Sequence, residues 1–134
     1  MDSYRVWYDF TKSKFRIAEL LLNDPEINFN DIMYSIQQAM EFALKTLIVY
    51  NKNSMPPKTH DMSSLCSIVE EDITLPQDTL EVILSMTDFV TQRYPHEFEI
   101  GTIDDCIEAY KVAQKLMEIV KNVVETPNIF KNNK

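Results

Sequence analysis

The chain has 134 residues, a formal net charge of −8 and one glycine. One glycine excludes the glycine-rich phosphate-binding loops, which need several glycines at fixed spacing. The negative charge argues against DNA and RNA as default ligands, because affinity for nucleic acids comes mostly from neutralising phosphates. No basic stretch followed by an apolar one opens the chain, and no window of about 18 residues lacks charges. We therefore expect a single cytoplasmic domain that neither crosses nor enters a membrane.

The first two helices are predicted from apolar spacing and from their boundary residues. Apolar or small side chains recur at steps of three and four from about residue 3 to residue 22, which is typical of one buried helix face. Pro25 ends this helix, since proline disfavours a helical residue before it. Asn28 or Asn30 can cap a second helix by accepting a backbone N–H. We expect that helix to continue to about Tyr50.

Three further helices are predicted in the second half of the chain. A shorter helix follows Thr59, whose hydroxyl can accept a backbone N–H. The next one begins near Pro76 and ends at Pro95. Thr102 and Asp105 have the spacing of a capping box at the start of the last helix. The apolar stripe expected on that helix consists of Ile103, Ile107, Tyr110, Ala113, Met117, Val120 and Val124.

No segment shows the alternation of apolar and polar residues that predicts a strand. The expected fold is all-α, an up-and-down antiparallel bundle of about five helices, four long and one short. Residues 1–126 are expected to form this bundle and residues 127–134 a frayed tail. Cys66 and Cys106 are isolated in the sequence. This spacing favours two buried, reduced thiols over a disulfide or a metal site.

The second predicted helix carries a polar and aromatic seam within about 60° of Gln38, at 100° per residue. The opposite side of the helix is apolar. Glu41 and Lys45 have the favourable i, i+4 order for an ion pair. Spacing alone favours a solvated face with a weak surface ion pair. The seam consists of Asp31, Tyr34, Ser35, Gln38, Glu41, Phe42 and Lys45.

Two short segments outside this helix also combine reactive side chains. Lys58-Thr59-His60-Asp61 places a cation, an imidazole and a carboxylate at the start of a helix. Capping explains Thr59 and Asp61, but it does not explain His60. Arg93-Tyr94-Pro95 lies at the end of the fourth predicted helix, where an arginine is favourable for the helix dipole.

These segments resemble the HEPN domain family, named for a nucleotide-binding domain of higher eukaryotes and prokaryotes. The family pattern has a Q-A-x-E-x-x-L-K helix, a T-H-D-L turn and an R-Y-P end to a later helix. Here Gln38–Lys45, Thr59–Met62 and Arg93–Pro95 match it in order. The resemblance covers the chain from the first helix to about Val124. It implies a helical bundle, in agreement with the periodicity.

The resemblance also implies several functions. Many small stand-alone members form a pair with a minimal nucleotidyltransferase, and homodimers are usual. Some members are metal-independent ribonucleases that act as toxins or in phage defence. Those nucleases carry an arginine and a histidine with four to six residues between them. From Arg93 these positions hold Phe98, Glu99 and Ile100, and His96 is only three residues on.

The candidate ligand-binding side chains are Gln38, Glu41, Lys45, His60, Asp61, Arg93 and Tyr94. In one interpretation Lys45 and Arg93 meet a phosphate, while Tyr94 stacks on a base. In the other, Gln38, Glu41, His60 and Arg93 form a buried polar network with no ligand. Two histidines without an H-E-x-x-H motif predict no zinc site, and we expect neither a metal nor a cofactor.

The leading hypothesis is a non-catalytic, homodimeric nucleotide-binding module that acts with a nucleotidyltransferase in a toxin–antitoxin or defence-like pair. The first alternative is a ribonuclease toxin that uses Arg93 with the displaced His96; RNA is a partner only in that case. The second alternative is a purely structural interaction protein.

Overall fold

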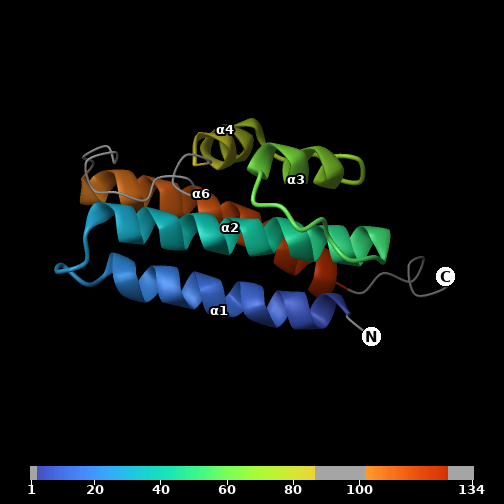
Figure 1. Ribbon diagram of the computed structural model, residues 1–134, viewed down its shortest axis with the longest axis horizontal. Helices are drawn as coiled ribbons and strands as arrows, with labels where there is room; N and C mark the ends of the chain where they lie inside the picture. The colour runs from blue at the N-terminus through green and yellow to red at the C-terminus, as the bar shows by residue number, and fades with distance from the viewer. Residues whose placement is uncertain (1–2, 87–101, 127–134) are drawn as a thin grey trace.

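The computed structural model describes residues 3–86 and 102–126 of the chain. These residues form α-helices and no strand, as expected for an all-α bundle (Figure 1). The bundle axis is made by three helices of 19, 24 and 23 residues, and α3 and α4 have only 8 and 9 residues. The helices are α1 (Tyr4–Leu22), α2 (Phe29–Lys52), α3 (Met62–Val69), α4 (Gln77–Ser85) and α6 (Ile103–Glu125).

The helix α2 lies at the centre of the fold and packs against α1, α6 and α3. In Figure 1, α1 lies on one side of α2, and the short helices α3 and α4 lie on the other. The chain of α1 runs opposite to α2, whereas α6 begins at the same end as α2. Since α2 is covered on several sides, most of its residues are buried, including polar ones.

The helix boundaries follow the predicted caps, with one exception. Asn28 caps α2 by accepting from the backbone N–H of Asp31. The capping box at the start of α6 is confirmed, since Thr102 and Asp105 each accept from the other's backbone N–H. Thr59 was expected to cap the third helix, but the N-cap is Asp61 and α3 begins at Met62. The carboxylate of Asp61 is the stronger acceptor for the free N–H groups of a helix start.

Two predicted helices differ in extent or in orientation. The fourth helix ends at Ser85, and its predicted continuation to Pro95 lies outside the described residues. The buried stripe of α6 is rotated from the predicted one, and Ile103 is 49% exposed. Of the predicted stripe, Ile107, Tyr110 and Met117 are only partly buried and lie beside the buried stripe. The buried residues of α6 are Cys106, Ala109, Ala113, Leu116 and Val120.

The two cysteines are buried and free, as the sequence predicts. Cys66 is 4% exposed and Cys106 is 0% exposed. Burial raises the pKa of both thiols to about 11, so the reactive thiolate is rare near neutral pH. Within residues 3–86 and 102–126, no helix combines the length and the apolar composition needed to span a bilayer.

Candidate functional site

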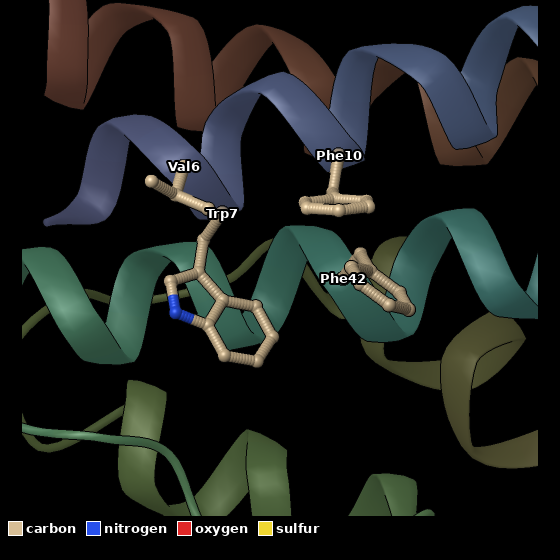
Figure 2. Close-up of a pocket in the computed structure, with 4 residues that line it drawn as sticks. All are labelled: Val6, Trp7, Phe10 and Phe42. Atoms are coloured by element: carbon tan, nitrogen blue, oxygen red, sulfur yellow. The ribbon is translucent and has the colours of Figure 1, made fainter. Parts of the chain in front are cut away.

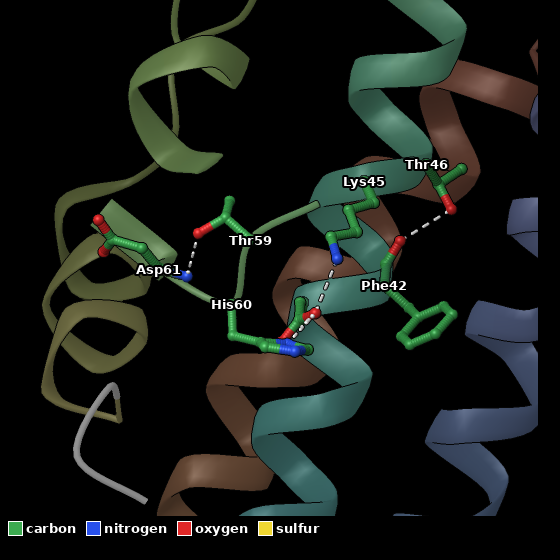
Figure 3. A network of polar contacts seen from close by, with 7 residues as sticks. Phe42, Lys45, Thr46, Thr59, His60 and Asp61 are labelled. Carbon is green, nitrogen blue, oxygen red and sulfur yellow. Dashed lines mark hydrogen bonds and ion pairs between the residues drawn. The ribbon is translucent and has the colours of Figure 1, made fainter. Parts of the chain in front are cut away.

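Three of the predicted side chains meet on one side of α2. Lys45 Nζ donates a hydrogen bond to Glu41 Oε2 at 2.9 Å. His60 Nδ1, from the connection between α2 and α3, lies 3.0 Å from the same oxygen and 3.2 Å from Oε1 (Figure 3). The side chain of Glu41 is 1% exposed and that of Lys45 is 10% exposed. The prediction of a solvated surface ion pair is therefore wrong, because the connection that carries His60 lies over this side of the helix.

The buried carboxylate of Glu41 controls the orientation of His60. An ionised carboxylate removed from water is costly unless hydrogen-bond donors surround it. Since a carboxylate only accepts, the Nδ1 atom of His60 carries the hydrogen in this contact. The side chain of His60 is nevertheless 65% exposed. Its Nε2 atom, which makes no hydrogen bond with the described residues, is therefore available to accept from or donate to a ligand.

Of the remaining predicted side chains, the two that the structure describes, Gln38 and Asp61, do not join this Lys45–Glu41–His60 cluster. Gln38 is half-buried on α2 and makes no hydrogen bond to the cluster. Asp61 accepts from the backbone N–H of Ser63 and from the hydroxyl of Ser64, so it serves as the cap of α3. Arg93, Tyr94 and His96 lie outside the described residues. Of the predicted network of four, the described residues therefore contain only the contact between Glu41 and His60.

An aromatic groove lies beside the cluster, between α1 and α2. It has a volume of about 300 Å³ and is lined by Val6, Trp7, Phe10 and Phe42 (Figure 2). The ring of Phe42 lies 5.8 Å from that of Trp7 and 6.2 Å from that of Phe10, centroid to centroid. Lys14 Nζ lies 5.2 Å from the centroid of Phe42, within cation–π range. The groove thus combines apolar walls with a cation at its edge.

The contribution of α1 to this groove was missed in the sequence. The apolar spacing of this helix indicates only its inward stripe, which includes Tyr8, Phe15 and Leu22. Trp7 and Phe10 stand outside that stripe. Two large aromatic residues outside the inward stripe were the signal that could have indicated a binding surface.

A second hollow of about 310 Å³ lies at the opposite end of α2, near the start of α6. Its lining includes the carboxylate of Asp24 and no cation, whereas Lys14 lies against Phe42 at the aromatic groove, so this hollow is less suited to an anionic ligand. Nor do the described residues bring together three or more histidine, cysteine, aspartate or glutamate side chains that could hold a metal ion. The lining residues are Asp24, Pro25, Ile27, Phe29, Ile32, Ile103 and Cys106.

Gln37 is an unexpected polar residue in the core. Its side chain is 0% exposed, and neither atom of its amide group makes a hydrogen bond with the described residues. It lies one helical turn before Glu41 on α2, and the sequence interpretation had placed only its neighbour Gln38 in the site. A buried amide without partners costs stability, because it gives up its hydrogen bonds to water.

The comparisons with known proteins agree with this fold. The HEPN domain model matches residues 4–123. Among solved structures, the crystal structure of TT1696 from Thermus thermophilus is similar with a TM-score of 0.76 and 24% sequence identity. The similarity covers 92% of this chain and 100% of that one, and at this identity it shows the fold alone. No curated protein matches the chain.

The burial of Gln37 leads to a stability prediction. Replacing it with methionine, Gln37→Met, keeps the approximate volume and removes the unpaired amide. We expect the free energy of unfolding to rise by about 1–3 kcal/mol in urea denaturation. The matched substitution Gln38→Met, one residue along at a half-exposed position, should change it by less than about 0.5 kcal/mol. A loss of stability in Gln37→Met would show that the amide has a bound partner.

Proposed function

This chain belongs to the HEPN domain family, and from this premise we propose that it is a non-catalytic nucleotide-binding module that acts with a nucleotidyltransferase. The observation that carries the nucleotide part is the position of the Lys45–Glu41–His60 cluster beside the aromatic groove. Phe42 lines the groove, and Lys45 follows it by three residues on the same helix. A nucleotide has an aromatic base that fits such a groove and a phosphate that suits a cation.

The side chains have different roles in this proposal. Glu41 does not contact the ligand, because its oxygens already accept from Lys45 and His60. It holds these two groups in place. Lys45 has three N–H donors and one of them is used by Glu41, so the others are free to meet a phosphate oxygen. His60 offers Nε2, and Gln38 offers an amide on the same side of α2.

Arg93 and Tyr94 belong to this proposal only as sequence predictions. The resemblance assigns a second cation and a stacking ring to these positions. Both lie outside the described residues. The proposed site does not require them, since Lys45 supplies a cation and Trp7 supplies a stacking ring. Phosphate binding would thus depend on helix side chains, as the single glycine of the chain demands.

The nucleotidyltransferase partner is supported by the resemblance to small stand-alone HEPN proteins. We expect a gene for a minimal nucleotidyltransferase next to the gene for this chain, and we expect the two products to co-purify when expressed together. The toxin–antitoxin or defence-like role depends on that pairing. A neighbourhood without such a gene in the source genome, together with separate elution of the chain and a candidate enzyme, would contradict this part of the proposal.

Nucleotide binding is testable through the single tryptophan of the chain, Trp7. Titration with AMP or ATP to millimolar concentration should quench its fluorescence, because a base that enters the groove stacks against the indole. Ribose 5-phosphate, which has no base, should compete with AMP without quenching. Unchanged fluorescence together with an unchanged melting temperature would rule out the groove as a nucleotide site.

The variant His60→Asn separates ligand binding from the support of Glu41. Asparagine can keep the hydrogen bond near the position of Nδ1 but has no group at the position of Nε2. We expect about tenfold weaker AMP binding, which is about 1.4 kcal/mol. The control variant is Lys115→Gln, which removes a surface cation from α6 where it pairs with Asp78. This control should bind AMP as the unmodified chain does.

The non-catalytic part of the proposal predicts that the purified chain leaves single-stranded RNA intact. The reason is that the arginine and histidine spacing of the nuclease members is absent after Arg93. The measurement is gel analysis of labelled RNA incubated with the chain and with Arg93→Ala. Cleavage by the unmodified chain that disappears in Arg93→Ala would replace this function with the ribonuclease alternative.

A further inference from the structure

The outer side of α1 carries a second apolar seam that is largely exposed, although two of its residues, Val6 and Phe10, also line the aromatic groove beside Phe42 of α2. Val6, Phe10, Ile17 and Leu20 are 45%, 54%, 43% and 55% exposed. With the exposed Ser13 between them, they follow one another at steps of four, three, four and three, the spacing of a coiled-coil seam. We call these five residues the outer seam. Its four apolar residues are half of the eight large hydrophobic residues that are exposed in the described part of the chain.

The outer seam is distinct from the face by which α1 joins the bundle. The buried residues of α1 are Tyr8, Thr11, Phe15 and Ala18. At 100° per residue this buried face points about 160° away from the outer seam. A surface helix that only covered a core would be polar on that opposite side. A contiguous exposed apolar strip of this kind marks an interaction surface.

The order of residues along the outer seam suits a second copy of the same helix running the opposite way. When a second α1 runs antiparallel with its Ser13 opposite Ser13, Val6 lies opposite Leu20. Phe10 then lies within one residue of the position opposite Ile17. A large side chain therefore meets a large one at each level. The small side chain of Ser13 meets its own copy at the centre, where two helices must approach most closely. A twofold interface requires this self-complementarity.

The charges beside the outer seam have the same symmetry. Asp9 and Arg16 lie on one flank of it, and reversal about Ser13 brings each to within one position of the other. In a twofold antiparallel pair the same flanks meet, so two reciprocal ion pairs form. Within the single chain these groups make only exposed contacts, Asp9 with Lys12 at 3.4 Å and Arg16 with Glu19 at 3.2 Å. Such exposed pairs are weak and can be exchanged at little cost.

We propose that the outer seam of α1 is the surface by which two copies of this chain pair, with antiparallel α1 helices and a twofold axis at Ser13. The resemblance implies a homodimer without naming a surface; here the exposed side chains select one. The 19 residues of α1 give a contact about 28 Å long. At its ends the partner's Leu20 lies against Val6, at the edge of the aromatic groove. Because Val6 and Phe10 also line the aromatic groove, the partner's α1 covers part of the proposed nucleotide site.

The first test is the molar mass in solution at several concentrations. Light scattering after size exclusion should give about twice the 15.7 kDa of the chain. Ile17→Glu places a charge in the outer seam and should weaken the pairing at least 100-fold, so that the monomer dominates at micromolar concentration. The control Leu84→Glu makes the same change at a 45% exposed position of α4 and should leave the dimer intact. Circular dichroism of both variants checks that they remain folded.

The second test fixes the axis and the direction of the helices. Ser13→Cys should form a disulfide-linked dimer on mild oxidation, because the two Cα atoms at the axis of a close helix pair come within disulfide range. Ser67→Cys, at an exposed position of α3, should not. Arg16→Asp should weaken the pairing by opposing like charges, and adding Asp9→Arg should restore it.

Three results would overturn the proposal. The first is a 15.7 kDa monomer at every concentration up to millimolar. The second is a dimer that Ile17→Glu leaves intact, which would place the interface elsewhere. The third is a chain that stays monomeric and associates only with an added acidic protein, a competing occupant because α1 has four basic side chains and two acidic ones. Molar mass and Trp7 fluorescence are separate measurements, so a failure of the pairing can be told apart from a failure of nucleotide binding although the two surfaces share Val6 and Phe10.

Discussion

The Glu41 carboxylate lies in the middle of α2 with 1% of its side chain exposed, and the arrangement around it follows from that burial. A charge that has lost its water must be met by donors. Lys45 comes from the next turn of the same helix, but His60 comes from the connection to α3. The contact between His60 and Glu41 therefore ties this connection to α2, two residues before α3 begins at Met62. The same contact holds the imidazole at the surface, where 65% of the His60 side chain is exposed.

The fold places two surfaces of different chemistry on either side of this buried charge. On one side, Lys45 and His60 present polar groups. On the other, Phe42 faces the aromatic side chains of α1, including Trp7. Both surfaces depend on α2 being the central helix, since only a helix with neighbours on several sides can bury a carboxylate and still line a groove. A solvated helix would have neither.

Much of the fold was predictable because the signals are local. Helical spacing, the cap at Asn28 and the capping box at Thr102 depend on residues three or four apart, and the structure confirms them. Candidate site residues were predicted less well. The ion pair of Glu41 with Lys45 and the contact of Glu41 with His60 are both present, but the sequence left open whether Glu41 is solvated or part of a buried network. The cap was assigned to Thr59, because sequence alone cannot rank adjacent acceptors.

By itself the sequence determined the helical class, the family resemblance and the exclusion of glycine-based phosphate loops, all of which rest on composition and short-range spacing. Only the tertiary structure decided that the ion pair of α2 is buried, which stripe of α6 faces the core, and that Trp7 and Phe42 share a groove. The physical reason is that burial is a property of the neighbours of a residue. Those neighbours come from segments far apart in the chain, so the pattern on one helix shows which side chains share a face but not what covers it.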